Sequence, residues 1–427
     1  MTEATSVKKG PTRAYVLHPD RGSGSARHAP ELALEEAVAL AAALPDLEVV
    51  GAEVVRLPKI TPATLFGSGK VAELAARFEA AGVDLVLVDG PVGPVQQRNL
   101  EKDWGVKLLD RTGLILEIFA DRARTREGVL QVELAALSYQ RTRLVRAWTH
   151  LERQRGGLGF VGGPGETQIE ADRRAIDEEV VKIRRQLAKV VKTRELHRAA
   201  RRKVPFPVVA LVGYTNAGKS TLFNRMTGAE VLAKDMLFAT LDPTMRGVVL
   251  PSGRKVILSD TVGFISDLPT QLVAAFRATL EEVLEADLIL HVRDIAHPET
   301  EEQAADVGDI LESLGVDEDV PIFEVWNKID LLSPDTRAAL LVQDARTPGI
   351  HAVSALTGEG IGALLAAMGQ ALDAERVAAE VFVPFSDGRR RAWLHEAGVV
   401  TDERPEEDGF RLSLLWTARQ KAAFEAL

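Results

Sequence analysis

The sequence predicts an α/β protein with four successive folded parts: an N-terminal α/β domain, a long antiparallel helical hairpin, a central α/β domain and a small C-terminal α/β domain. Two observations support this prediction. Strand-like apolar runs alternate with amphipathic helical stretches over most of the chain, which is typical of largely parallel sheets covered by helices. After the first domain, this alternation gives way to a seven-residue repeat of apolar positions, which is typical of paired helices.

The composition is that of a folded protein without cysteine. With 427 residues, of which 46% are hydrophobic, the chain is long enough for several domains that each bury a core. The absence of cysteine excludes disulfides and thiolate metal sites. The first residues are polar, and no apolar run approaches the ~18 residues of a membrane span. We therefore expect a cytoplasmic protein that has no membrane span and acts as a monomer.

The first part of the chain predicts a polar tail followed by an α/β domain. Residues 1–13 are expected to be a disordered tail, and residues 14–120 alternate strands and helices. Within them, the stretch 67–70 (Gly-Ser-Gly-Lys) resembles half of a phosphate loop. However, Thr64 stands in place of the first glycine, and Val71 replaces the Ser or Thr. We expect a turn that starts a helix, with a second nucleotide site as the alternative.

Residues 121–203 predict the helical hairpin. The glycine-rich stretch 154–165 separates two helical seams and would form the tip. Each arm would have ~25 residues and a length of ~38 Å. The first seam consists of Leu130, Leu134, Leu137, Arg141, Leu144, Trp148 and Leu151, and the second of Ile176, Val180, Ile183, Leu187 and Val190.

The hairpin is basic although the whole chain has a net charge of −10. Residues 173–203 contain twelve basic residues and four acidic ones. The first arm adds Arg141, Arg143, Arg146, Arg153 and Arg155. A rod with this charge and an apolar tip suits a structured nucleic acid, because cationic side chains bind phosphates. A spacer between domains is the alternative.

The central domain, residues 204–375, contains a full G-x-x-x-x-G-K-S phosphate loop after the apolar run 208–212 and before a helical stretch. Its backbone N–H groups would bind phosphates, Lys219 would reach the β and γ phosphates, and Ser220 would bind Mg²⁺. The loop residues expected to bind nucleotide are Gly213, Tyr214, Thr215, Asn216, Ala217, Gly218, Lys219, Ser220 and Thr221.

Two further motifs follow strand-like runs in the order that a guanine-nucleotide site requires. Asp260, Thr261, Val262 and Gly263 come after residues 256–258. Asp260 would hold the metal through water, and the Gly263 N–H would meet the γ phosphate.

The second motif consists of Asn327, Lys328 and Asp330, and Ser354 and Ala355 complete the base pocket. The Asp330 carboxylate can accept both hydrogens on the N1 and N2 edge of guanine, a donor pair that adenine lacks. The sequence therefore predicts a P-loop GTPase domain that binds GTP or GDP with Mg²⁺. Residues 376–427 predict only a small C-terminal α/β domain.

The chain resembles the HflX-type GTPases, a family of ribosome-associated GTPases. The resemblance rests on residues 163–174 (GPGETQIEADRR), 238–242 (FATLD) and 260–265 (DTVGFI). It implies binding to the large ribosomal subunit, with the hairpin near the ribosomal RNA of the peptidyl transferase centre. It also implies the splitting of stalled or idle ribosomes under stress.

The resemblance also selects the switch threonine. Spacing alone leaves Thr240 and Thr244 as candidates for completing the Mg²⁺ coordination, and the resemblance implies Thr240. Residues 228–246 would then be a mobile switch segment. The resemblance adds Phe238, Ala239, Leu241 and Asp242 to the nucleotide-binding residues. We expect Lys219, Thr240 and Gly263 to act in catalysis.

Phe264 stands where Ras-type GTPases have a water-orienting glutamine. An aromatic ring cannot orient water, so we expect slow hydrolysis by the free protein and a partner or monovalent cation that completes the site. Asn216 is similar to the asparagine of potassium-stimulated GTPases and suggests K⁺; alternatively, Asn216 only stabilises the loop.

Two other functions compete with a GTP switch. An RNA-remodelling ATPase would use residues 67–70 of the N-terminal domain. A non-enzymatic RNA-binding scaffold would need a nucleotide domain that has lost turnover, which the intact Lys219, Ser220, Asp260 and Gly263 disfavour.

Overall fold

The computed structural model describes most of the chain. It covers residues 10–22, 27–154, 164–201, 206–229, 237–238, 241, 243–267, 280, 282–317, 319–374, 377–416 and 418–425. The chain forms two compact units. The first comprises residues 1–187, 234–242 and 266–277, and the second comprises residues 188–233, 243–265 and 278–427. Each unit is described by itself.

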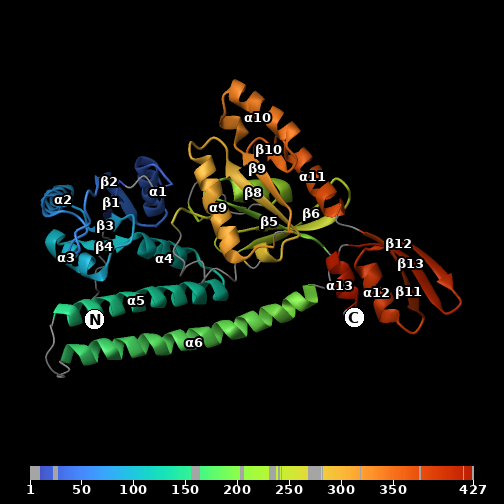
Figure 1. The fold of residues 1–427 in the computed structure, drawn as a ribbon, viewed down its shortest axis with the longest axis horizontal. Helices are drawn as coiled ribbons and strands as arrows, with labels where there is room; N and C mark the ends of the chain where they lie inside the picture. Colours follow the sequence, from blue (N-terminus) through green and yellow to red (C-terminus); the bar gives the residue numbers. More distant parts are fainter. Residues whose placement is uncertain are drawn as a thin grey trace, which may run out of the picture. The chain divides into compact units, whose positions relative to one another are not determined.

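The first unit contains a four-stranded parallel sheet with the order β2-β1-β3-β4 (Figure 1). The strands are β1 (Thr12–Asp20), β2 (Leu47–Arg56), β3 (Leu85–Val88) and β4 (Lys107–Asp110). The accompanying helices are α1 (Pro30–Ala42), α2 (Ser68–Ala81), α3 (Pro94–Trp104) and α4 (Arg111–Arg122). β1 begins inside the stretch expected to be a tail. The strand order reverses between β1 and β3, and open α/β sheets bind ligands at such points.

Helix α4 is an element that the sequence analysis did not separate from its surroundings. Asp110 caps it, because its carboxylate accepts a hydrogen bond from the Gly113 N–H at 2.8 Å. Leu114, Ile118 and Phe119 are buried on it. Their spacing of four and five residues places them on one broad face of the helix.

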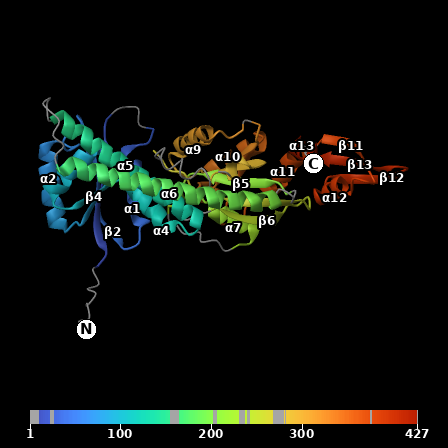
Figure 2. The same cartoon turned by 90° about the horizontal axis from the view of Figure 1, so that it is seen from below.

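The hairpin is formed by α5 (Arg126–Gln154) and α6 (Pro164–Arg201). α5 and the first half of α6 lie side by side in both views (Figure 1, Figure 2), and Arg141 Nε lies 2.8 Å from a carboxylate oxygen of Asp177. Val180 and Ile183 of the predicted seam are buried. The tip, 155–163, and the side chains of Leu144, Trp148 and Leu151 lie outside the described residues.

Arg143 differs from the expectation that the first arm exposes all its arginines. Its guanidinium is half-buried and donates to Asp110 Oδ2 at 3.1 Å and to Gln97. Arg143 therefore fastens α5 to the N-terminal domain, so it is not a phosphate ligand on the hairpin surface. The side chains of Arg146, Arg153 and Arg155 lie outside the described residues.

The second unit contains a six-stranded sheet with the order β10-β9-β8-β5-β7-β6, in which β6 is antiparallel to β7 and the other pairs are parallel. The strands are β5 (Val208–Gly213), β6 (Thr244–Val249), β7 (Lys255–Asp260), β8 (Leu288–Asp294), β9 (Ile322–Asn327) and β10 (Ile350–Ala352). The helices are α7 (Lys219–Thr227), α9 (Thr300–Leu314), α10 (Pro334–Arg346) and α11 (Ile361–Ala374), with a short 3₁₀ helix η1 (Ile329–Leu331). Each predicted nucleotide motif follows the carboxyl end of a parallel strand, so the motifs share one edge of the sheet.

The C-terminal part is a three-stranded antiparallel sheet with the order β11-β13-β12. Its elements are β11 (Val377–Pro384), α12 (Gly388–Glu396), β12 (Val400–Glu406), β13 (Gly409–Trp416) and α13 (Ala418–Glu425). Leu394, Leu412 and Trp416 belong to its own buried core.

The predicted fold class is confirmed: an α/β protein with a P-loop domain, an N-terminal α/β domain, the helical hairpin and a C-terminal α/β domain. Among the described helices, none combines the length and the apolar character that crossing a membrane requires.

Candidate nucleotide site

The phosphate loop connects β5 to α7, and its backbone conformation depends on glycine. Gly218 has a φ of 92°, and a Cβ there would lie 2.2 Å from Asn327 Nδ2. A side chain would therefore both strain the backbone and displace Asn327. Asn216 also has a positive φ, 58°, which asparagine tolerates better than most residues. Its side chain is exposed.

Lys219 lies inside the loop and is 6% exposed. Its Nζ donates to Gly213 O at 3.0 Å and to Tyr214 O at 2.7 Å. Burial lowers the pKa of Lys219 to about 8, and the nearby Asp260 carboxylate opposes this shift. Two backbone carbonyls thus bind the ammonium in this structure. A phosphate would replace their partial negative charges with a full negative charge.

The candidate metal ligands lie next to each other. Ser220 Oγ donates to Asp260 Oδ2 at 2.7 Å, and Asp260 is fully buried. A hydroxyl and a carboxylate oxygen form the hard donor set that Mg²⁺ prefers, so these residues fit that ion. Thr261 Oγ1 donates to Leu211 O at 2.6 Å, which ties the segment after β7 to β5.

Gly263 lies beside Lys219. A Cβ on Gly263 would approach Lys219 Nζ to 3.0 Å and the Thr215 side chain to 2.8 Å. The glycine is therefore required for this close approach, and its backbone reaches the region where Lys219 would meet a γ phosphate.

Phe264 is fully buried. Its N–H donates to Gly213 O at 3.1 Å, and its carbonyl accepts from the Thr215 N–H at 2.7 Å. The residue at the glutamine position of Ras-type GTPases thus anchors the segment to the phosphate loop.

Asn327 joins the phosphate loop to the predicted base pocket. Its Nδ2 donates to Ala217 O at 2.8 Å, and its Oδ1 accepts from the Ala355 N–H at 2.9 Å. Ser354 Oγ accepts from the Thr357 N–H at 3.0 Å, which closes the turn after β10. Asp330 lies on η1 and is half-buried.

Lys328 has a partner that the sequence analysis missed. Its Nζ donates to Asp294 Oδ2 at 2.7 Å, and its backbone φ is 68°. Asp294 ends β8, on the edge of the sheet shared by the other motifs. Asp294 follows a buried apolar strand in the sequence, and this position could have identified it as a residue of the site.

The remaining predicted residues are partly described. Tyr214, Ala217, Val262, Phe238 and Leu241 are buried, and Thr221 lies in the first turn of α7. Ala239, Thr240 and Asp242 lie outside the described residues. Thr244 begins β6 and pairs with Asp260 across the ladder. Residues 244–246, at the end of the segment predicted to be mobile, are strand in this structure.

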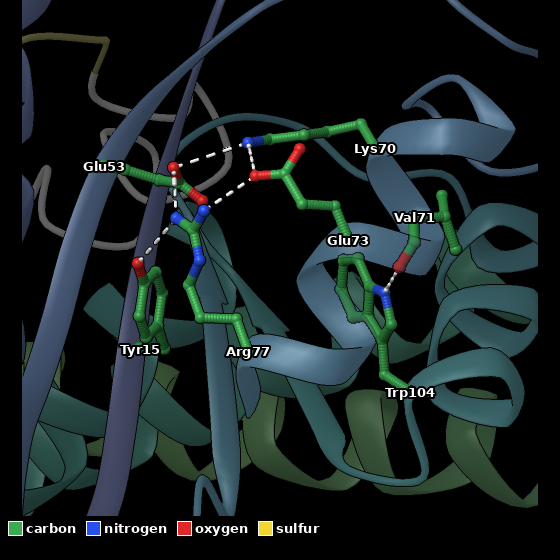
Figure 3. Close-up of polar contacts among 7 residues, drawn as sticks. All are labelled: Tyr15, Glu53, Lys70, Val71, Glu73, Arg77 and Trp104. Atoms are coloured by element: carbon green, nitrogen blue, oxygen red, sulfur yellow. Dashed lines mark hydrogen bonds and ion pairs between the residues drawn. The ribbon is translucent and has the colours of Figure 1, made fainter. Parts of the chain in front are cut away.

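The half phosphate loop of the N-terminal domain has a different structure. Gly67 has a φ of −66° and precedes α2 as an ordinary helix start. Lys70 lies between two carboxylates, with Nζ 2.9 Å from Glu73 and 3.4 Å from Glu53, and Arg77 pairs with both (Figure 3). The two carboxylates already bind this lysine and would repel a phosphate. The structure therefore contains the expected turn that starts a helix.

Four family models match successive parts of the chain between residues 31 and 426. Residues 31–120 match the model described as GTP-binding GTPase N-terminal, and residues 122–201 match the GTP-binding GTPase middle region. Residues 208–328 match the 50S ribosome-binding GTPase model, and residues 339–426 match the HflX C-terminal domain.

Curated relatives agree with these matches. The GTPase HflX of Magnetococcus marinus is 55% identical over 362 residues, which are 85% of this chain and 83% of the relative. The GTPase HflX of Escherichia coli is 47% identical over 348 residues, 82% of this chain and 81% of the relative. That of Lacrimispora saccharolytica is 38% identical over 409 residues, 96% of this chain and 94% of the relative. This protein is therefore a GTPase of the HflX family.

Proposed function

We propose that this GTPase is a molecular switch that binds the large ribosomal subunit through its helical hairpin and splits stalled or idle ribosomes. The observation that carries the proposal is the combination of a complete guanine-nucleotide constellation with a basic helical hairpin in one chain. The description of the matched central model, a 50S ribosome-binding GTPase, and the ribosome-associated character of the family agree with it.

The hairpin supplies the contact surface for ribosomal RNA. In the described half of α6, Val180 and Ile183 of the seam are buried, whereas six basic side chains are exposed. These are Arg173, Arg174, Lys182, Arg184, Arg185 and Lys189. Exposed lysine and arginine bind phosphates without reading sequence, so this surface suits structured RNA near the peptidyl transferase centre.

The nucleotide site supplies the switch. Lys219 would move from the loop carbonyls to the β and γ phosphates, where it neutralises charge that develops during hydrolysis. Ser220, Thr240 and, through water, Asp260 would hold Mg²⁺, which neutralises the phosphate oxygens when bound. The Gly263 N–H would donate to the γ phosphate. Loss of that phosphate would release the segments that contain Thr240 and Gly263.

Base selection is assigned to Asp330. We expect Asp330→Asn to weaken GTP binding by about a hundredfold, because an amide cannot accept both guanine hydrogens and places its own donor against one of them. The same variant should improve binding of xanthosine triphosphate, whose edge carries an acceptor there. Competition binding with GTP, ATP and xanthosine triphosphate measures both effects. Unchanged GTP preference would contradict the assignment.

Slow hydrolysis by the free protein follows from Phe264, whose ring is buried and cannot orient water. We propose that the ribosomal partner or a monovalent cation completes the site. Asn216, exposed on the loop, is the residue that would receive K⁺, and its positive φ equally suits a loop-stabilising role. Equal turnover in sodium and potassium buffers would remove the cation.

The deciding experiment measures GTP and ATP turnover by the full chain in potassium buffer, with and without large ribosomal subunits, alongside sedimentation of intact ribosomes. We expect GTP-specific stimulation by the subunit and separation of the two subunits. Lys219→Ala should lose turnover. No stimulation, or a preference for ATP, would overturn the proposal.

A further inference from the structure

The segment that follows Gly263 is held by an arginine far away in the sequence. Ser266, three residues after Gly263, belongs to the first unit. Arg111, the first residue of α4, donates from Nη2 to Ser266 O at 2.8 Å and to Ser266 Oγ at 2.9 Å. Arg111 is 7% exposed and Ser266 is 9% exposed, so water competes little for these bonds.

A network of carboxylates fixes the Arg111 guanidinium. Its Nη1 donates to Asp89 Oδ1 at 2.5 Å, and its Nη2 also pairs with Glu36. Although burial alone would raise it, the pKa of Asp89 is held below its usual range by Arg111 and by His18, whose Nδ1 lies 2.7 Å away. Ser266 Oγ also donates to Glu36 at 2.8 Å. A planar guanidinium held on two sides is preorganised for its third partner, Ser266.

The place of this contact in the sheet is informative. His18 lies near the carboxyl end of β1, Asp89 directly follows β3, and Arg111 directly follows β4. The strand order reverses between β1 and β3, where open α/β sheets bind their ligands. In this chain, Ser266 contacts residues at that position. The N-terminal domain thus uses its ligand-binding edge for a segment of the chain itself.

Within the second unit, the residues just before Ser266 are held by the phosphate loop. Phe264 exchanges backbone hydrogen bonds with Gly213 and Thr215. Gly263 is close enough to Lys219 that a Cβ would lie 3.0 Å from its Nζ. Within this unit, Gly263 therefore already lies beside the lysine.

The same helix holds the other switch segment. Phe119 of α4 packs edge to face against Phe238, with ring centroids 4.7 Å apart. Phe238 is 3% exposed, belongs to the first unit and precedes Thr240 by two residues. Within the first unit, Phe238 is thus held by α4.

We propose that Arg111 is a positioning residue for GTP hydrolysis: by fixing Ser266, it keeps Gly263 beside Lys219, ready for the γ phosphate. The inference rests on the proposed contact between the Gly263 N–H and the γ phosphate, and it needs no ribosome. Because GDP lacks that phosphate, the contribution of Arg111 is specific to GTP. A purely structural role would affect both nucleotides equally.

The test uses Ser266→Ala in the full chain, since this change removes the hydroxyl without leaving a buried charge unpaired. We expect affinity for a non-hydrolysable GTP analogue and basal kcat to fall about tenfold, the effect of one lost hydrogen bond to a charged group, while GDP affinity stays within about twofold. Arg111→Lys, which keeps the charge but loses the fork, should do the same.

Two further variants separate the explanations. His18→Gln loosens the same network through Asp89 without touching Ser266, so it should lower the ratio of GTP-analogue to GDP affinity by a smaller factor than Ser266→Ala. Gly263→Ala tests the underlying assignment and should abolish the preference for the GTP analogue. If Gly263→Ala has no effect, the proposed γ-phosphate contact fails. If Gly263→Ala acts and neither Ser266→Ala nor Arg111→Lys does, the role of Arg111 alone is overturned, because Ser266→Ala keeps the bond to the backbone oxygen of Ser266. Faster turnover by Ser266→Ala would also overturn it, because the contact would then restrain hydrolysis.

Discussion

At the scale of single residues, burial sets the chemistry of Lys219. Its pKa falls to about 8 from the ordinary 10.5 because the ammonium is desolvated. The unfolded chain therefore binds more protons than the folded one between these values. The contribution of this group to the free energy of unfolding is least favourable below pH 8 and rises as pH increases toward 10.5.

The same shift predicts how nucleotide affinity depends on pH. A polyphosphate favours the charged ammonium, so above pH 8 binding requires uptake of a proton. We expect GDP affinity to fall by up to about tenfold per pH unit between pH 8 and 9.5. Titration calorimetry over this range measures it. Lys219→Ala should bind weakly with a flat profile, and a flat profile in the unchanged protein would contradict the pKa shift.

His291 predicts an acid sensitivity of the nucleotide domain. Burial lowers its pKa to about 4 from 6.5, with Glu324 opposing the shift and Arg293 assisting it. As pH falls below 6.5, the unfolded state takes up a proton that the folded state refuses, so stability is lost toward pH 4. We expect the unchanged protein to lose about 2 kcal/mol more than His291→Gln between pH 7.5 and 5. Urea unfolding at both pH values measures the difference, and parallel losses would refute it.

At the scale of elements, two adjacent residues at the junction between β4 and α4 each hold a different segment of the chain. Arg111 holds Ser266, while the neighbouring Asp110 accepts from Tyr139 Oη at 2.5 Å and from Arg143 of α5 at 3.1 Å. Although burial raises the pKa of Asp110, the capping Gly113 N–H and the Arg143 charge oppose this effect. Two neighbouring residues thus hold different segments of the first unit, Arg111 the residue Ser266 and Asp110 the helix α5.

The hairpin seam predicts different outcomes for two substitutions on one helix. Ile183 is 3% exposed and Val181 is 45% exposed, and both lie on α6. We expect Ile183→Ala to lose about 2 to 4 kcal/mol, because it leaves a cavity between the arms. Val181→Ala should change stability by less than about 0.5 kcal/mol. Thermal unfolding followed by circular dichroism compares them, and equal effects would refute the seam.

At the scale of the whole molecule, charge is unevenly distributed. The chain carries a net charge of −10, yet residues 173–203 are strongly basic. The net charge gives the entire protein no long-range attraction to RNA, so the proposed contact with RNA would depend on the local charge of the hairpin. This arrangement favours binding in one orientation, because the remaining acidic surface is repelled by phosphate.

Binding to the large subunit should therefore depend on salt through the hairpin. We expect affinity to fall at least tenfold between 50 and 200 mM salt, since each phosphate contact releases counterions. Replacing Arg184 and Arg185 by alanine should lower the slope of log affinity against log salt by about one to two. Replacing exposed Lys102 and Arg346 in the same way is the control. An unchanged slope in the hairpin variant would locate binding elsewhere.

The sequence by itself determined the order of the parts, the phosphate loop and the buried positions Val180 and Ile183. Each of these is a local pattern: the period of apolar residues reports the helix or strand, and a motif after a strand reports its place on the sheet edge. Local patterns did not predict the ion pair between Lys70 and Glu53, because Lys70 lies on helix α2 and Glu53 on strand β2.

Only the tertiary structure decided the contacts between distant segments. Asn327 with Ala217, Lys328 with Asp294 and Arg111 with Ser266 lie far apart in the chain, and no local periodicity encodes such pairs. The same holds for the burial of Phe264 beneath the phosphate loop. These side chains find their partners because a buried polar or charged group needs one and the packed sheets bring specific partners within reach.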